Sequence, residues 1–271
     1  MTGMVEFIDD RHFTVGSTRY FSTFPIVKAP ADHLPVMKPR ALVERLASHL
    51  ASVRADTIVE LGIRGGGSTA LIAQLARPSR LVAVEIAEQP VGALRDFIST
   101  HGLEEVVKPH YGLDQADRER LAAVLDAELG PRLIDLVIDD ASHRLAETRS
   151  SFETLFPRLR PGASFVLEDW NAKHLLADRI MRNLRAEPAG ELAHRITGAL
   201  ERDETASAEQ PLSYLVIELM LACASRDEAI ESVTIDAQWV VVRRGPAALD
   251  HRTFRLSQRY EDHFNLTSAG R

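Results

Sequence analysis

Cysteine is almost missing from the sequence, since Cys223 is the single one among 271 residues. One cysteine excludes an intrachain disulfide and any zinc site built from several thiolates. Such sparse use of cysteine is typical of proteins kept in a reducing compartment. We therefore expect the protein to be cytoplasmic.

Long hydrophobic runs and blocks of one charge are missing as well. The longest apolar stretch, 212–224, is interrupted by Glu218 and is well short of the roughly 20 residues that a membrane span needs. The first residues lack a basic region followed by an apolar core, so no signal peptide is predicted. The net charge of −7 is spread without a basic block, which argues against nucleic acid as a partner.

Hydrophobic residues make up 45% of the sequence, which is enough for a substantial core. They occur in patterns that alternate between strand and helix spacing. Short apolar runs bounded by turn residues predict strands, and apolar residues at helical spacing predict the helices between them. This order predicts an α/β fold with a doubly wound, mostly parallel sheet of the Rossmann-like type. The expected strands are 57–61, 81–84, 106–107, 134–138 and 165–167, and the expected helices are 39–53, 69–76, 90–100, 116–129 and 145–159.

The rest of the chain is divided by its composition. Two last strands with a short turn between them are expected to pair as an antiparallel hairpin, which brings the sheet to seven strands. Three helices, 175–184, 190–200 and 212–224, are expected before that hairpin, on the substrate side. The predicted divisions are a covering arm at 1–40, a main domain at 41–245 with a helical insertion at 171–225, a hairpin at 232–242, and a tail or oligomer arm at 246–271.

A glycine-rich turn, 62–67, joins the first predicted strand to a helix, with Glu60 before it and Ser68 after it. Glycines let the backbone approach a ligand closely, and the free N–H groups at a helix start donate hydrogen bonds to it. Glu85 ends the next strand, 19 residues after Gly66, where a nucleotide-binding sheet places an acid for the ribose hydroxyls. A tight connection with Glu85 as a helix cap is the alternative.

Three further residues are candidates for the same ligand. Asp114 and Gln115 follow the third predicted strand, and Asp114 either faces an adenine ring or caps the next helix. Lys38 stands just before the first helix, where it is either a solvated charge or a contact for a bound carboxylate.

Acidic residues follow two neighbouring strands. The strand 134–138 stops at Asp139–Asp140, and the strand 165–167 ends in Glu168–Asp169. In open α/β sheets the carboxyl ends of the strands bind ligands, so these acids are expected to gather with His143, a possible general base. Clustered carboxylates suit a hard divalent cation such as Mg²⁺ better than zinc or non-haem iron. Capping by Asp140 and a solvated His143 are the alternative.

Two of these motifs resemble those of a known family. Glu60-Leu61-Gly62 with Gly66 resembles the first motif of class I S-adenosylmethionine-dependent methyltransferases. The segment 138–143, followed by Glu168-Asp169, resembles more narrowly the metal-dependent sugar O-methyltransferases of macrolide biosynthesis and the related cephalosporin-hydroxylase-like group. Many members have glycine where Ala141 stands. The resemblance covers residues 38–175 well and the remainder only in outline.

The resemblance implies a Mg²⁺-dependent O-methyltransferase that acts on a hydroxyl of a sugar or glycosylated metabolite. It implies that Asp140, Glu168 and Asp169 hold the metal and that His143 is the base, with His174 as the alternative. The residues expected to bind S-adenosylmethionine are Lys38, Glu60, Gly62, Gly66, Ser68, Glu85, Asp114, Gln115 and Asp139.

Rival functions stay open on the sequence alone. A nicotinamide-dependent oxidoreductase could use the same sheet and glycine loop, but it has no evident use for three clustered carboxylates. An oxygen-using hydroxylase would want the two-histidine iron triad. A catalytically silent cofactor-binding or scaffold protein would not need His143. Homo-oligomerisation is also open.

Overall fold

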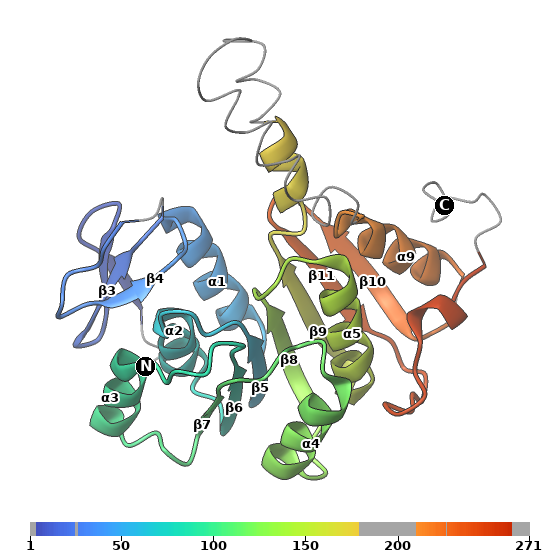
Figure 1. The fold of residues 1–271 in the computed structure, drawn as a ribbon, viewed down its shortest axis with the longest axis horizontal. Coiled ribbons are helices and arrows are strands. Elements are labelled where there is room, and N and C mark those ends of the chain that lie inside the picture. Colours follow the sequence, from blue (N-terminus) through green and yellow to red (C-terminus); the bar gives the residue numbers. More distant parts are fainter. Residues whose placement is uncertain (1–3, 25–26, 179–209, 226, 262–271) are drawn as a thin grey trace.

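A seven-stranded sheet forms the centre of the computed structural model, which describes residues 4–24, 27–178, 210–225 and 227–261. The strands lie in the order β10-β11-β9-β8-β5-β6-β7, and β11 pairs antiparallel with both of its neighbours while the other pairs are parallel (Figure 1). The predicted doubly wound sheet and its closing hairpin are thus confirmed. The strands are β5 (Thr57–Leu61), β6 (Arg80–Val84), β7 (Val107–His110), β8 (Ile134–Asp139), β9 (Leu159–Glu168), β10 (Ile230–Ile235) and β11 (Trp239–Arg244).

Helices cover both faces of this sheet, which explains why its central strands have buried apolar residues on both faces. Successive side chains of a strand point to opposite faces, so Ile58 packs in the core on one side and Val59 in the core on the other. One layer holds α1 (Arg40–Ser52), α2 (Gly67–Ala76) and α3 (Gly92–His101), and the other holds α4 (Arg118–Leu129), α5 (Leu145–Leu155) and α9 (Ser213–Ala224) (Figure 1).

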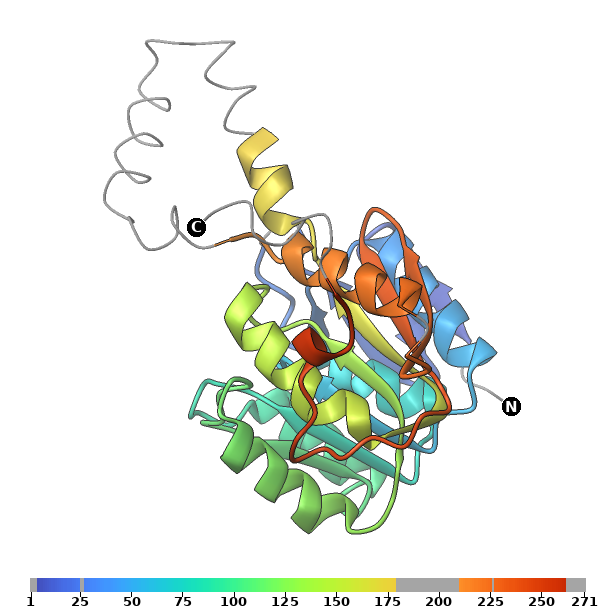
Figure 2. The ribbon, with the colours of Figure 1, turned by 90° about the vertical axis from the view of Figure 1, so that its right-hand side faces the viewer.

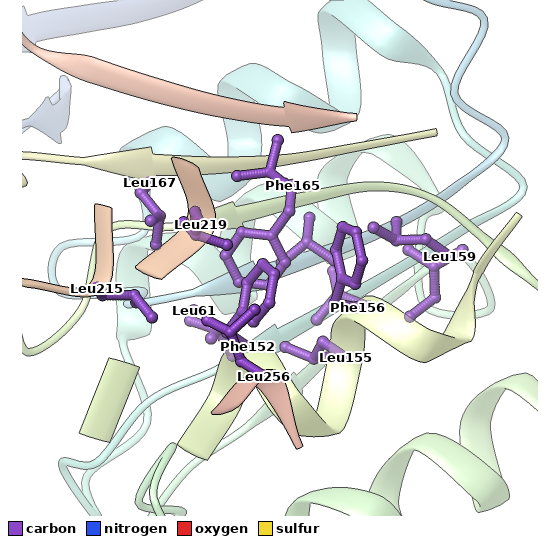
Figure 3. Packing of buried hydrophobic residues seen from close by; sticks show 14 of the residues in the cluster. Leu61, Phe152, Leu155, Phe156, Leu159, Phe165, Leu167, Leu215, Leu219 and Leu256 are labelled. Carbon is purple, nitrogen blue, oxygen red and sulfur yellow. The ribbon is translucent and has the colours of Figure 1, made fainter. Parts of the chain in front are cut away.

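Aromatic rings fill the core between α5 and the sheet. The ring of Phe152 lies 4.6 Å from that of Phe156 and 5.0 Å from that of Phe165, centroid to centroid (Figure 3). All three side chains are fully buried. Because full burial of one such side chain contributes about 1.5–3 kcal/mol, this group fixes α5 firmly on β9 and so positions the strand ends on which the site is built.

Several predicted boundaries are wrong, and the strand expected at 165–167 already begins at Leu159. The helix expected to run to residue 159 ends at Leu155, and a 3-10 turn at Phe156–Arg158 leads directly into β9. Pro157 has no N–H to continue the helix, which explains the early stop. The third strand extends to His110 although it contains Pro109, and it can do so because β7 is at the edge of the sheet.

The N-terminal residues form a second sheet of four strands. They are β1 (Val5–Phe7), β2 (His12–Val15), β3 (Thr18–Ser22) and β4 (Leu34–Val36), drawn in blue beside α1 and α2 (Figure 1). The rings of Phe13 and Tyr20 stack at 5.2 Å between centroids and are buried. The segment expected to be a covering arm is therefore a sheet, and its buried side chains share the core of α1, α2 and α3.

The C-terminal segment packs on the main domain as far as residue 261. Phe254 and Leu256 are buried, and the Leu256 N–H donates to Glu153 Oε1 of α5 at 2.9 Å. A tail was expected at 246–271, but Phe254 and Leu256 within it are buried. Residues 262–271 lie outside the described ones.

The predicted insertion is described only at its two ends. Residues 172–178 are helical and extend away from the sheet (Figure 2), while α9 packs against α5 and β10. The predicted helix 190–200, and the end of the helix 175–184, lie outside the described residues. No helix within the described ranges is long and apolar enough to cross a membrane.

Candidate functional site

A pocket of about 470 Å³ opens at the carboxyl ends of β5, β6 and β8, where the sequence placed the ligand. Its lining combines the glycine loop, the acidic strand ends and part of the N-terminal segment. Of the predicted residues it is lined by Lys38, Gly62, Ser68, Glu85, Asp114, Gln115, Asp140, His143 and Asp169, whereas Glu60, Gly66, Asp139 and Glu168 are not among the lining residues.

Two glycines of the loop cannot be replaced without strain. Gly62 has a φ of +97°, and a Cβ there would clash with the carbonyl oxygen of Asp140. Gly66 has a φ of +80°, and its Cβ would lie 2.6 Å from Leu94 Cβ. Both positions thus need glycine for backbone conformation and for space, which brings the end of β5 tightly against the end of β8.

The N-terminal sheet forms part of the pocket wall. A Cβ at Gly65 would lie 2.7 Å from Pro35 Cγ, and one at Gly67 would clash with the Pro35 carbonyl. Pro35 of β4 therefore lies directly on the glycine loop. Pocket residues that the sequence patterns did not reveal come mostly from this contact and from the loop itself: Thr23, Pro35, Met37, Arg64, Ser142 and Glu147.

Glu85 binds the backbone of the glycine loop. Its Oε2 accepts from the N–H groups of Ile63 at 3.1 Å and Arg64 at 2.6 Å, and its Oε1 accepts from the Ala87 N–H at 3.0 Å. These bonds hold the loop in shape, and Glu85 also lines the pocket. The expected contact with a ribose stays a prediction.

Glu60 lies beneath the loop rather than in the pocket. Its carboxylate is buried on β5 and accepts from Thr69 Oγ1 of α2 at 2.6 Å. Burial raises the pKa of Glu60 to about 7, although hydrogen bonds from Ser68 and Thr69 oppose the shift. Glu60 thus ties the strand to the helix start and supports the loop from behind.

Asp139 and Gln115 form a buried polar network. Asp139 Oδ2 accepts from Ser151 Oγ at 2.9 Å and from Gln115 Nε2 at 3.3 Å, and Gln115 Oε1 accepts from the Ser142 N–H at 3.2 Å. Burial raises the pKa of Asp139 to about 7. The network fixes the segment that leads from β8 to His143.

Asp114 stabilises a turn before α4 and lines the pocket. Its Oδ1 accepts from the Ala116 N–H at 2.8 Å, while the N-cap of α4 is Asp117, which accepts from the Arg120 N–H at 3.1 Å. The helix cap is therefore not Asp114, and a contact of Asp114 with a bound ring stays a prediction.

Asp140, His143 and Asp169 meet at the acidic end of the pocket. One possible ligand atom from each lies within 4.8 Å of the others, and His143 Nε2 is 3.7 Å from Asp140 Oδ1. His143 and Asp169 have φ values of +53° and +51°. Backbone strain of this kind costs about 1–3 kcal/mol per residue and is found preferentially at functional sites.

Lys38 lies inside the acidic cluster. Its ammonium donates to Asp140 Oδ2 at 2.7 Å and to Glu168 Oε2 at 2.6 Å, and its side chain is 3% exposed. Burial alone would lower the pKa of Lys38, but the carboxylates of Glu168 and Asp140 raise it above its ordinary value. Burial raises the pKa of Glu168, and Lys38 opposes that shift. Lys38 is therefore not a solvated charge, because its ammonium bonds to two carboxylates of the protein itself.

The donor set of this cluster fits a hard divalent cation. Glu168 Oε1 is buried and has no hydrogen-bond partner among the described residues. Buried polar atoms normally have a partner, and a bound cation would supply one. The possible ligand atoms of Asp140, His143 and Asp169 lie within 4.8 Å of one another, and Lys38 connects Glu168 to Asp140. Carboxylates are the ligands that Mg²⁺ prefers, and Mg²⁺ retains water or substrate oxygens in its other positions.

The alternative base, His174, lies elsewhere. It is exposed, its Nε2 is 2.8 Å from Ser213 Oγ, and it is absent from the pocket lining. The described geometry thus brings His143 to the acids and leaves His174 beside α9.

Comparison with known families and structures agrees with this fold. Residues 59–170 match the family model of a methyltransferase domain. They span β5 to the end of β9, with the glycine loop and the acidic cluster. This part of the chain is thus similar in sequence to a methyltransferase domain.

The relatives of this chain include named sugar O-methyltransferases. It is 38% identical over 124 residues to 8-demethyl-8-α-L-rhamnosyl tetracenomycin-C 2′-O-methyltransferase of Streptomyces olivaceus, covering 43% of this chain and 29% of that protein. It is 48% identical over 60 residues to mycinamicin VI 2″-O-methyltransferase of Micromonospora griseorubida, covering 22% and 14%. These matches thus span less than a third of either relative.

A solved structure has the same fold. MycE methyltransferase from the mycinamycin biosynthetic pathway, in complex with Mg, SAH and mycinamycin VI, superposes with a TM-score of 0.50 at 23% identity. The match covers 74% of this chain and 49% of that one. At this identity the likeness establishes the fold.

Proposed function

We propose that this chain is a Mg²⁺-dependent O-methyltransferase that moves a methyl group from S-adenosylmethionine to a hydroxyl of a sugar or glycosylated metabolite. The observation that carries the proposal is one pocket that joins a glycine loop to a carboxylate cluster with a histidine. The named activities of the relatives support the same substrate class. That MycE has been solved with Mg and SAH supports the choice of cofactors.

One end of the pocket would bind the cofactor, and the other would bind the metal. The loop from Gly62 to Ser68, supported by Glu85, would hold the cofactor with its methyl group toward the acids. Asp140, Glu168 and Asp169 would hold the metal. Fixing both reactants in one pocket makes the transfer effectively unimolecular, which accounts for much of the rate in two-substrate reactions.

His143 would take the proton of the acceptor hydroxyl. A sugar hydroxyl is a poor nucleophile at neutral pH, and a bound Mg²⁺ supplies the positive charge that stabilises its oxygen as the proton leaves. The C–S bond of the sulfonium breaks as the new C–O bond forms, and the sulfur retains the electron pair of the broken bond. The proton would end on the imidazole, whose Nε2 lies 3.7 Å from Asp140 Oδ1.

A thermal-shift comparison separates this function from its rivals. A ligand that binds only the folded protein raises the melting temperature, so S-adenosylhomocysteine should stabilise the protein and NADH should not. Stabilisation by NADH alone would instead favour an oxidoreductase. Methylated products from a panel of saccharides and glycosylated natural products, detected by mass spectrometry, would then identify the acceptor and exclude a silent scaffold.

Three expectations are not addressed by this fold and stay predictions from the sequence. They are the cytoplasmic location, the lack of a nucleic-acid partner and the possibility of a homo-oligomer.

A further inference from the structure

Lys38 reaches the acidic cluster from the N-terminal sheet, outside the domain that supplies the acids. It follows β4, and its carbonyl accepts from Ser22 Oγ of β3 at 2.7 Å. Its ammonium donates to both Asp140 and Glu168. Two of its three N–H groups are therefore committed to carboxylates that are expected to bind the metal.

The acids themselves are positioned by backbone, independently of Lys38. The Asp140 N–H donates to the Leu61 carbonyl at 3.0 Å, and the Asp169 N–H donates to the Gln238 carbonyl at 3.0 Å. Glu168 is the last residue of β9, which pairs with β8 on one side and β11 on the other. Removing the lysine side chain would thus leave these backbone bonds in place and remove a positive charge from the cluster.

The charges of the cluster balance only when Lys38 is counted. Asp140, Glu168 and Asp169 carry three negative charges when ionised, and the ammonium leaves two of them unbalanced. One divalent cation balances those two. The same ammonium occupies one oxygen each of Asp140 and Glu168, so it competes with an incoming metal for these carboxylates.

We propose that Lys38 is a resident cation that neutralises part of the charge of the acidic cluster without metal and weakens its binding of a divalent ion, so that one ion binds reversibly. This inference rests on the metal site of the proposed function. It makes the N-terminal sheet a part of the metal site, because β3 and β4 hold the backbone of Lys38.

The test uses the full chain with Lys38→Met, which retains the length of the side chain and removes the charge. Mn²⁺ serves as the probe, since carboxylate sites that take Mg²⁺ also take Mn²⁺ and its free concentration is measured by electron paramagnetic resonance. Loss of a positive charge a few ångströms from the site should tighten Mn²⁺ binding about tenfold or more. The metal-free variant should melt at a lower temperature than the wild type, and saturating Mn²⁺ should narrow that gap.

Lys108→Met is the matched control, because Lys108 also pairs with a carboxylate, Glu105 at 3.2 Å, but on β7 and outside the pocket. It should leave Mn²⁺ affinity unchanged. If Lys38→Met does not fold, Glu168→Gln is compared with Lys38→Met/Glu168→Gln, in which one acid and one base are removed together. The double variant should bind Mn²⁺ about tenfold or more tightly than the single one.

Mn²⁺ binding that is unchanged or weaker in the variants without Lys38 would overturn the inference, since Lys38 would then position ligands or have no effect. Failure of both the wild type and Lys38→Met to bind Mn²⁺ would overturn it too. S-adenosylhomocysteine binding and methyl transfer in the same wild-type sample distinguish that failure from failure of the proposed function. A wild type that transfers methyl groups while Lys38→Met binds Mn²⁺ no better defeats the inference alone.

Discussion

The two walls of the pocket differ in what they present to a ligand. The wall at β5 and α2 presents backbone and glycines, and its acids bond within the protein, Glu85 to the backbone of the loop and Glu60 to Thr69 of α2. The wall at β8 and β9 presents side-chain charges, with Lys38 among them. Under the proposed function, binding of the cofactor would therefore depend on shape at one wall, and the chemistry would depend on charge at the other.

The largest expected effect is the loss of methyl transfer when an acid of the charged wall is removed. Asp140→Ala or Glu168→Ala should abolish methyl transfer, because each removes a proposed metal ligand, while S-adenosylhomocysteine binding stays nearly intact. Calorimetry with S-adenosylhomocysteine and a turnover assay on the same samples check this. Equal loss of cofactor affinity in both variants would show that the walls are not separable.

The next effect concerns the base at the charged wall. His143→Ala should lower turnover by roughly 10²–10⁴-fold, the usual range for loss of a positioned base, with binding of metal and cofactor retained. His174→Ala serves as the control, because the imidazole of His174 lies beside Ser213. This variant should turn over nearly as fast as the wild type. If the two results are exchanged, the base has been misassigned.

A glycine replacement tests the shape of the other wall. Gly62→Ala combines a strained φ of +97° with a clash against the Asp140 carbonyl, so it should lower the free energy of unfolding by about 3 kcal/mol or more. Gly16→Ala has a φ of +58° and nothing within 4 Å, so it should lose only about 1–2 kcal/mol. Denaturant unfolding measures both, and equal losses would show that close packing of β5 on β8 is unimportant.

The last prediction is a pH dependence behind the glycine loop. With its pKa raised to about 7, folded Glu60 retains its proton at pH values where the unfolded carboxyl, at 4.5, has lost it. Stability contributed by the protonated form is therefore lost as pH rises from about 4.5 to about 7, by at most about 1.4 kcal/mol per pH unit.

Glu60→Gln cannot titrate, so over this window its unfolding free energy should fall less than that of the wild type. Urea unfolding at about pH 5 and about pH 7.5 checks this, with the exposed Glu104→Gln as control. A wild-type pH slope that Glu60→Gln leaves unchanged would mean that Glu60 is ionised in the folded protein throughout.

The sequence predicted most of the sheet because its signals are local. The apolar run before Asp139 and the glycine turn after Leu61 each lie within a few residues, and both were placed correctly. The end of α5 was misplaced by four residues because Pro157 outweighed the apolar spacing that continues to Leu159. Helix boundaries respond to single residues in this way.

The candidate site was predictable in its residues but less so in their partners. The contact of Lys38 with Asp140 spans 102 positions and that with Glu168 spans 130. No local pattern reports contacts at such separations, and the sequence therefore left Lys38 between a solvated charge and a ligand contact. Pro35 was missed for the same reason, since its contact with the glycine loop depends on how β4 packs.

The most direct measurement of the whole account is methyl transfer from isotopically labelled S-adenosylmethionine to a panel of glycosylated metabolites, with Mg²⁺ or with EDTA. The account predicts a labelled O-methyl product in Mg²⁺, none after EDTA, and recovery when Mg²⁺ is returned. Equal product in EDTA would contradict the metal-dependent chemistry assigned to the charged wall. No product on any acceptor, from protein that binds both Mg²⁺ and S-adenosylhomocysteine, would contradict the proposed acceptor class.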